Sequence, residues 1–167
     1  ITALKQALGD TPLDVLINNA GIIGPDRQNP GDVDIDGWRL TMEVNMIAPY
    51  LVTNALADNV AASDEKKVVI VSSRMGSVSE TTSPDRMVYR SSKAAVNMVA
   101  QCMALTLQPR GVNLIPVHPG WVSTDMGGSS APVTPAESAA GILKLVDRMG
   151  PDMPMKLWNF AGDSFEF

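Results

Sequence analysis

The sequence is poor in cysteine and in aromatic residues. It contains one cysteine, which excludes an intramolecular disulfide and is typical of proteins in a reducing compartment. Aromatic residues make up 5% of the 167 residues, so a packed core must be mainly aliphatic. No apolar run is long enough to cross a bilayer, and the chain does not start with a charged-then-apolar signal segment. These features predict a soluble protein of the cytoplasm.

Positive charge is scarce as well. The chain has 13 lysines and arginines against 18 acidic residues, a net charge of −5, and no basic stripe. Because nucleic acids and anionic membranes attract clustered positive charge, we expect neither as a partner.

We also expect no metal site. The only histidine, His118, precedes a proline at the end of an apolar run and is interpreted as structural.

The sequence does contain short apolar runs separated by longer segments with helical periodicity. The runs interpreted as strands are 14–18, 67–73, 112–119 and 155–162, and the segments interpreted as helices are 36–62, 87–109 and 134–150. The first three runs are almost continuously aliphatic, which is typical of parallel strands covered on both faces. Pro49 should bend or interrupt the first helix, and Thr134 with Glu137 forms a capping box at the start of the last.

The alternation of strands and helices predicts a single α/β domain with a doubly wound parallel sheet. In such sheets ligands bind at the carboxyl ends of the strands. Polar stretches follow the first three strands: "NNAGIIGP" at 18–25, "SSRMGSVSE" at 72–80 and "HPGWVSTDMGG" at 118–128. Each of them, taken alone, could be an ordinary loop.

Tyr89 and Lys93 are four residues apart on the predicted helix 87–109, so their side chains share one helix face. An ammonium close to a phenol lowers the pKa of the phenol, which suits a proton-transfer pair. The alternative is an amphipathic helix in which the tyrosine packs and the lysine reaches water. Spacing alone does not decide between them.

These stretches occur together in one order, and in that order the sequence resembles the single-domain branch of the short-chain dehydrogenase/reductase family. The matching motifs are "NNAG" at 18–21, "EVNMIAPYLV" at 43–52, "SS" at 72–73, "YRSSK" at 89–93 and "HPGWVSTDM" at 118–126. Within the family, the motifs look most similar to the carbonyl reductases that include the sniffer and C-factor proteins. The resemblance covers essentially the whole chain.

The resemblance implies a catalytic set made of Asn45, Ser73, Tyr89 and Lys93. Tyr89 would be the general acid/base, and Lys93 would lower the pKa of Tyr89 and bind the nicotinamide ribose. Ser73 would hold the carbonyl oxygen; it is preferred to Ser72 because it aligns with the family serine three residues before the glycine. Asn45 would anchor a water that links Lys93 to solvent.

The resemblance also implies a nicotinamide cofactor, NADP or NAD, with NADP slightly favoured. The residues expected to contact it are Asn19, Ala20 and Gly21 at the adenosine ribose, Pro119, Gly120, Val122 and Thr124 at the nicotinamide end, and also Tyr89 and Lys93. The substrate would be a small-molecule carbonyl or alcohol.

The glycine-rich phosphate-binding turn of the family has no counterpart, because the chain contains no G-x-G. The residues before Asp14 predict only the end of one helix. We therefore expect residues 1–167 to form one incomplete Rossmann-like domain, with the N-terminal strands and the phosphate-binding loop missing. The strand at 14–18 should then be an unpaired apolar edge, and the chain either a fragment of a longer enzyme or a truncated gene product.

Alternative functions remain open from the sequence. The leading hypothesis is an NAD(P)-dependent oxidoreductase that interconverts a carbonyl and an alcohol by hydride transfer. The alternative is a truncated, non-catalytic family member that acts as a binding or subunit-interaction module. A third possibility is an epimerase or dehydratase that shares Y-x-x-x-K.

The resemblance implies a possible homo-oligomer through helices 36–62 and 87–109. The apolar residues Met98, Cys102 and Met103 could serve such contacts, but core packing is the preferred interpretation.

Overall fold

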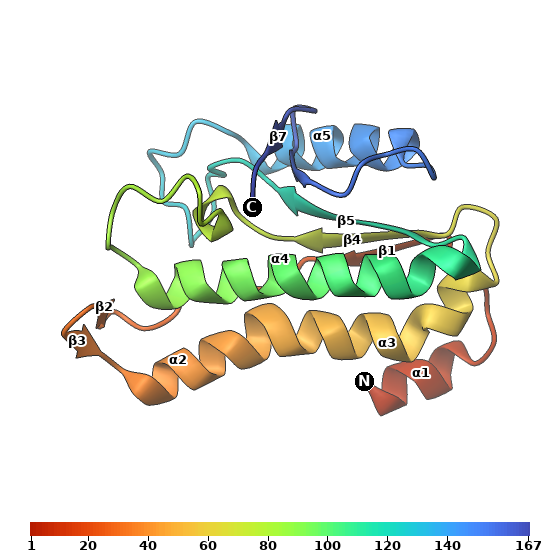
Figure 1. Cartoon of the computed structure of the whole chain (residues 1–167), viewed down its shortest axis with the longest axis horizontal. Helices are drawn as coiled ribbons and strands as arrows, with labels where there is room; N and C mark the ends of the chain where they lie inside the picture. The colour runs from red at the N-terminus through yellow and green to blue at the C-terminus, as the bar shows by residue number, and fades with distance from the viewer.

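The apolar runs form a five-stranded sheet at the centre of the molecule (Figure 1). The computed structural model describes all residues from Ile1 to Phe167. In spatial order the strands are β1 (Val15–Asn18), β4 (Lys67–Val71), β5 (Asn113–His118), β6 (Leu157–Asn159) and β7 (Ser164–Phe165). Neighbours from β1 to β6 pair in parallel, and β7 pairs with β6 antiparallel. The predicted α/β fold with a parallel sheet is confirmed.

Helices cover both faces of this sheet. The helices are α1 (Thr2–Leu8), α2 (Ile35–Met42), α3 (Ala48–Ala61), α4 (Met87–Leu107) and α5 (Pro135–Arg148), with one-turn 3₁₀ helices η2 (Arg74–Gly76) and η3 (Gln108–Arg110). The helices α3 and α4 lie side by side on one face, and α5 lies on the other (Figure 1).

Alternation along β4 explains how the two helical layers are held. Val68 and Ile70 pack in one core cluster with Val96 of α4, and Val69 packs in a second cluster with Leu145 of α5. Successive side chains of a strand point to opposite faces, so a continuous aliphatic run serves both layers. Each such side chain, fully buried, stabilises the fold by about 1.5–3 kcal/mol.

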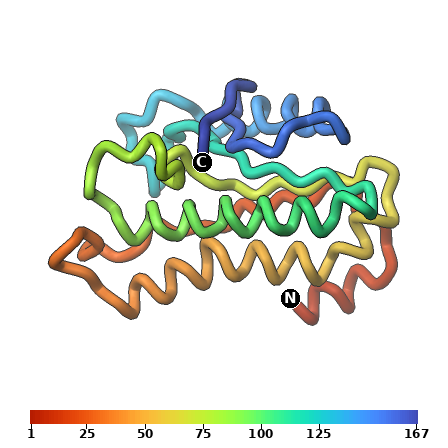
Figure 2. The backbone as a smooth tube through the Cα atoms, viewed as in Figure 1, coloured from red at the N-terminus to blue at the C-terminus, as the bar shows by residue number.

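The predicted helix 36–62 is interrupted where proline was expected to disturb it. A π-helical turn, η1 (Glu43–Ile47), joins α2 to α3, and within it the Ala48 N–H donates to the Glu43 carbonyl five residues back. Pro49 follows at the start of α3, where its missing N–H removes one ordinary helical bond. The three segments still form one continuous rod beside α4 (Figure 2). The wide turn carries Asn45, whose side chain is buried.

The ends of the chain's elements differ from the prediction in places. The capping box at α5 is present, with the Glu137 N–H donating to the Thr134 hydroxyl and the Thr134 N–H to the Glu137 carboxylate. The strand expected at 155–162 is only β6, because the chain turns back at Gly162 (φ 104°) to form β7. The hairpin of β2 (Gln28–Asn29) and β3 (Asp32–Val33) was not predicted, since two-residue strands carry no periodicity.

The preferred core placement of Met98 and Cys102 is wrong. Met98 is 64% exposed and Cys102 is exposed, whereas Met103 is buried. The core-facing stripe of α4 runs through Val96, Ala100, Met103 and Leu107, at the spacing of one helix face. Met98 and Cys102 lie off that stripe.

The strand β1 lies at the edge of the sheet and pairs only with β4, as predicted. Ile17 of this strand is 39% exposed.

None of the helices combines the length and the apolarity needed to cross a membrane.

Candidate active site

The predicted catalytic residues gather where β4 ends against the first turns of α4. The β4 strand leads into Ser72 and Ser73, and α4 carries Tyr89 and Lys93 on its buried face. Tyr89 is 8% exposed and Lys93 4% exposed. The pair therefore does not have the surface arrangement in which a lysine reaches water.

Lys93 is held by backbone rather than by a carboxylate. Its Nζ donates to the Val71 carbonyl at 3.0 Å and lies 5.8 Å from the centre of the Tyr89 ring. A Cβ placed on Gly21 would lie 3.5 Å from this Nζ and 3.4 Å from Asn45 Oδ1. The loop after β1 thus passes the lysine closely and presents only bare backbone to the ammonium.

The two serines at the end of β4 have different partners. Ser72 Oγ donates to Asn97 Oδ1 at 2.5 Å and is turned into the interior. Ser73 Oγ accepts the Met75 N–H at 3.1 Å, and the Ser73 side chain lies close enough to the Tyr89 phenol to lower its pKa. Ser73 is therefore the serine placed to share an oxygen atom of a substrate with Tyr89.

The helical turn η2 brings Ser73 to α4 by close packing at Gly76. A Cβ on Gly76 would lie 2.6 Å from the backbone carbonyl carbon of Lys93 and 2.8 Å from its Cβ. Real side chains do not approach so closely, so only glycine permits this contact. The contact fixes the distance between the segment that carries Ser73 and α4.

Burial shifts the pKa values of both members of the pair. It raises the pKa of Tyr89, while the nearby Ser73 side chain and the charge of Arg86 act in the opposite direction. It lowers the pKa of Lys93 to about 8. The expected lowering of the Tyr89 pKa by Lys93 is not found in the chain by itself. The ammonium points to the Val71 carbonyl, and the loss of hydration of the phenol dominates.

Both amide hydrogens of the Asn45 side chain are used in hydrogen bonds to other protein groups. Its Nδ2 donates to the Ile22 carbonyl at 2.8 Å and to Ser92 Oγ at 2.9 Å, and its Oδ1 accepts the Ile22 N–H at 2.8 Å. Any water at its side chain could bind only to the oxygen. The clear role of Asn45 is to join the loop after β1 to α4.

The residues expected at the cofactor follow the ends of β1 and β5, which flank β4 in the sheet. Asn19 and Ala20 are exposed and Gly21 is half-buried. On the other side, Pro119, Gly120 and Val122 are half-buried and Thr124 is exposed. The Thr124 hydroxyl is used within its own turn, where it accepts the Gly127 N–H at 3.2 Å. Both groups thus lie at the carboxyl edge that also carries Ser73, with Thr124 at its periphery.

His118 takes no part in this cluster. Burial, aided by the charge of Arg74, lowers the pKa of His118 to about 4, so the ring is neutral at pH 7. Its Nδ1 has no hydrogen-bond partner, and its ring packs edge-on against Phe165 with centres 5.9 Å apart.

Two polar residues of the site were not singled out from the sequence. Ser92 receives the Asn45 amide, and Gln28 receives the Tyr89 backbone N–H at 3.2 Å. Ser92 lies inside the motif "YRSSK", so the motif could have pointed to it. Gln28 has no local sequence signal, because its partner is 61 residues away.

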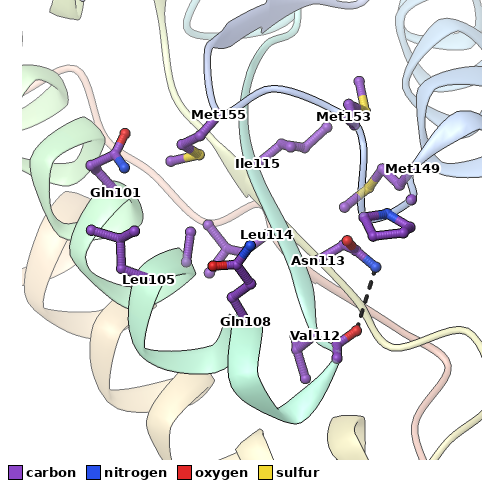
Figure 3. Close-up of a pocket in the computed structure, with 14 residues that line it drawn as sticks. Gln101, Leu105, Gln108, Val112, Asn113, Leu114, Ile115, Met149, Met153 and Met155 are labelled. Atoms are coloured by element: carbon purple, nitrogen blue, oxygen red, sulfur yellow. Dashed lines mark hydrogen bonds between the residues drawn. The ribbon is translucent and has the colours of Figure 1, made fainter.

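A hollow elsewhere on the molecule is lined by α4, the start of β5 and the segment after α5 (Figure 3). Its walls include Leu105, Met149, Met153 and Met155, and it contains no titratable side chain. It lies at the amino end of β5, the opposite end from the Tyr89 cluster, and offers no group for proton transfer.

Comparison with known proteins gives consistent matches. Residues 1–133 match the family model described as short chain dehydrogenase. The C-signal protein of Myxococcus xanthus is 38% identical over 151 residues, which cover 90% of each chain.

Solved structures agree with this match. The NADPH-bound carbonyl reductase from chicken fatty liver superposes with a TM-score of 0.89 at 27% identity, over 99% of this chain and 70% of that chain. The carbonyl reductase Sniffer of D. melanogaster superposes with a TM-score of 0.88 at 28% identity, over 99% of this chain and 71% of that chain.

Proposed function

This chain belongs to the short-chain dehydrogenase family. We propose that it functions as an NADP(H)-dependent oxidoreductase that interconverts a carbonyl and an alcohol. The resemblance to the family predicted from the motifs is confirmed, and Sniffer is among the similar structures. The names of the similar carbonyl reductases support the reaction class, and the NADPH bound to the chicken enzyme supports the cofactor.

Buried Lys93 is the observation that carries the proposal. The residue is 4% exposed, its ammonium donates to a backbone carbonyl, and its pKa is lowered by burial alone. Burying a charge without a counter-ion is costly, and an ordinary helix has no need of it. A buried lysine beside a buried phenol is explained if both take part in proton transfer.

In the direction of reduction, the Tyr89 phenol donates its proton to the carbonyl oxygen while the Ser73 hydroxyl holds that oxygen. The nicotinamide, when bound, supplies the hydride that the carbonyl carbon receives. Lys93, with a pKa of about 8, is the group that would return a proton to Tyr89 after the transfer. Hydride on carbon and a proton on oxygen together make the alcohol.

The residues that would hold the cofactor are those at the ends of β1 and β5. Asn19, Ala20 and Gly21 line one side, and Pro119, Gly120, Val122 and Thr124 line the other. At Gly21 the loop presents only backbone beside Lys93, so no side chain of that residue would stand between a ribose and the ammonium. The chain contains no G-x-G turn for the pyrophosphate, and the residues named here account only for the ribose and nicotinamide ends of the cofactor.

The test is NADPH oxidation with a panel of small aldehydes and ketones. Tyr89→Phe should lower turnover by at least about a hundredfold while NADPH binding is retained, because the proton donor is lost. Tyr50→Phe is the matched control, since Tyr50 is the only other tyrosine and is 43% exposed. Unchanged turnover in Tyr89→Phe would contradict the proposed mechanism. NADPH binding without turnover of any carbonyl would favour a binding module.

We also propose that the exposed face of α3 and α4 pairs with a second copy of the chain. Tyr50 and Leu51 of α3 and Met98 and Leu105 of α4 are large exposed apolar side chains on these neighbouring helices. Clustered exposed apolar residues are typical of interaction surfaces. The cytoplasmic location stays a prediction.

A further inference from the structure

The helix that carries Tyr89 begins without a cap of its own. Arg86, at the N-cap position of α4, has left-handed backbone angles (φ 53°, ψ 39°) and makes no side-chain capping bond. The first N–H groups of a helix have no partner within the helix. Two of them are satisfied from β2: Asn29 Oδ1 accepts the Arg86 N–H at 3.0 Å, and Gln28 Oε1 accepts the Tyr89 N–H at 3.2 Å.

Gln28 uses the other end of its amide on the loop that follows β1. Its Nε2 donates to the Pro25 carbonyl at 2.8 Å and to the Ile23 carbonyl at 3.3 Å. The residue is 7% exposed, and both amide hydrogens and the oxygen are bonded. One buried side chain therefore ties the loop at 22–25 to the backbone of Tyr89.

The tie is part of a closed ring of hydrogen bonds. The Tyr89 carbonyl accepts the Ser92 hydroxyl at 2.8 Å, and Ser92 Oγ accepts the Asn45 amide at 2.9 Å. Asn45 bonds both backbone groups of Ile22, which leads back to the loop held by Gln28. The ring thus passes through both the N–H and the carbonyl of Tyr89. Satisfied buried networks of this kind hold one arrangement of the backbone.

The loop is also shaped to approach α4. Gly24 has φ 89°, and a Cβ placed on it would lie 3.0 Å from Thr41 Oγ1 and 3.3 Å from Val88 Cγ1. A side chain there would push the loop away from the helix. Glycine at this position lets Gln28 reach the Tyr89 backbone.

We propose that Gln28, assisted by Asn29, is a positioning residue for Tyr89, because it holds the first turn of α4 against the loop after β1 and so sets the place of the phenol relative to Ser73. The kinetic consequence rests on the function proposed above, whereas the positioning itself does not. Gln28 contacts no reacting atom and acts only through the backbone of Tyr89.

The test follows the Tyr89 phenol directly, in a Tyr50→Phe background that leaves it as the only tyrosine. A carbon-13 label on the tyrosine Cζ then reports its titration. Gln28→Met keeps the size of the side chain and removes all its hydrogen bonds. The matched control is Asn59→Leu, which removes another buried amide; Asn59 donates to the Gly9 and Thr11 carbonyls, away from the site.

In Gln28→Met we expect the Tyr89 titration midpoint to move toward the value of a free tyrosine, because a loosened first turn leaves the phenol less buried. Turnover should fall about ten- to a hundredfold, with little change in KM for the carbonyl substrate. Asn59→Leu should lower the stability of the fold without either effect. Asn29→Ala, at an exposed residue, should give a smaller shift of the midpoint in the same direction.

An unchanged Tyr89 midpoint in folded Gln28→Met would overturn the proposal, and so would an equal shift in Asn59→Leu. If Gln28→Met does not fold, Asn29→Ala decides, and an unchanged midpoint in that variant overturns the proposal. If the midpoint moves as expected but no variant, including the parent, reduces any carbonyl, the positioning stands and the proposed function fails.

Discussion

Burial acts on Tyr89 and Lys93 in opposite senses. It disfavours the charged form of each group, so the pKa of Tyr89 is raised and that of Lys93 is lowered to about 8. Near neutral pH Tyr89 therefore holds its proton while Lys93 can exchange one. These protonation states suit a phenol that must carry a proton before it acts and must regain that proton afterwards.

The free energy of unfolding should record the cost of burying Lys93. The pKa of a lysine in the unfolded chain is about 10.5, so the unfolded chain binds more protons than the folded one between about pH 8 and 10.5. The cost, about 3 kcal/mol, is present in full below pH 8 and shrinks as the pH rises.

We predict that Lys93→Met is more stable than the parent at pH 7 by about 1–3 kcal/mol. This range is the cost of burying the charge, which the variant no longer carries, less the contribution of the lost hydrogen bond to Val71. The difference should narrow when urea unfolding is repeated at pH 9, because the parent gains stability. Lys144→Met, at an exposed lysine, is the control and should show no such narrowing. A parent at least as stable as Lys93→Met at pH 7 would contradict this account.

At the scale of elements, the site depends on how closely η2 packs on α4. Gly76 touches the backbone of Lys93, and Ser73 immediately precedes this helical turn. The position of Ser73 is thus decided by a contact between two backbones. Such a contact has no flexible side chain that could move away.

Gly76→Ala should destabilise the fold by at least about 1–3 kcal/mol, because its methyl group would overlap Lys93 and force η2 away from α4. Gly150→Ala is the matched control, since nothing lies within 4 Å of a Cβ there. Urea unfolding of both variants measures the difference. Equal stability of the two variants would show that η2 can shift freely.

For the molecule as a whole, the exposed apolar side chains of α3 and α4 are the feature that the single chain does not explain. Leu105 is 63% exposed and Met98 64% exposed, on the face of α4 turned away from the sheet. A second copy that covers this face would remove them from water.

Leu105→Glu should therefore lower the fraction of oligomer, because a carboxylate would be buried at the interface. Leu143→Glu is the control, since Leu143 on α5 is 55% exposed on the opposite layer. Light scattering after size-exclusion chromatography reads out the mass. A parent protein that is monomeric at all concentrations would refute the proposed pairing.

Local patterns in the sequence determined the sheet, the helices and the order of the motifs. Continuous aliphatic runs specify buried parallel strands, and Thr134 with Glu137 specifies a helix start, because these signals depend only on near neighbours. Tertiary structure decided the rest of the site. Gln28 meets Tyr89 across 61 residues and Asn45 meets Ser92 across 47, and the pKa of Tyr89 follows burial rather than its neighbour in sequence. Such contacts and the loss of hydration arise only when distant segments pack together, so no local pattern encodes them.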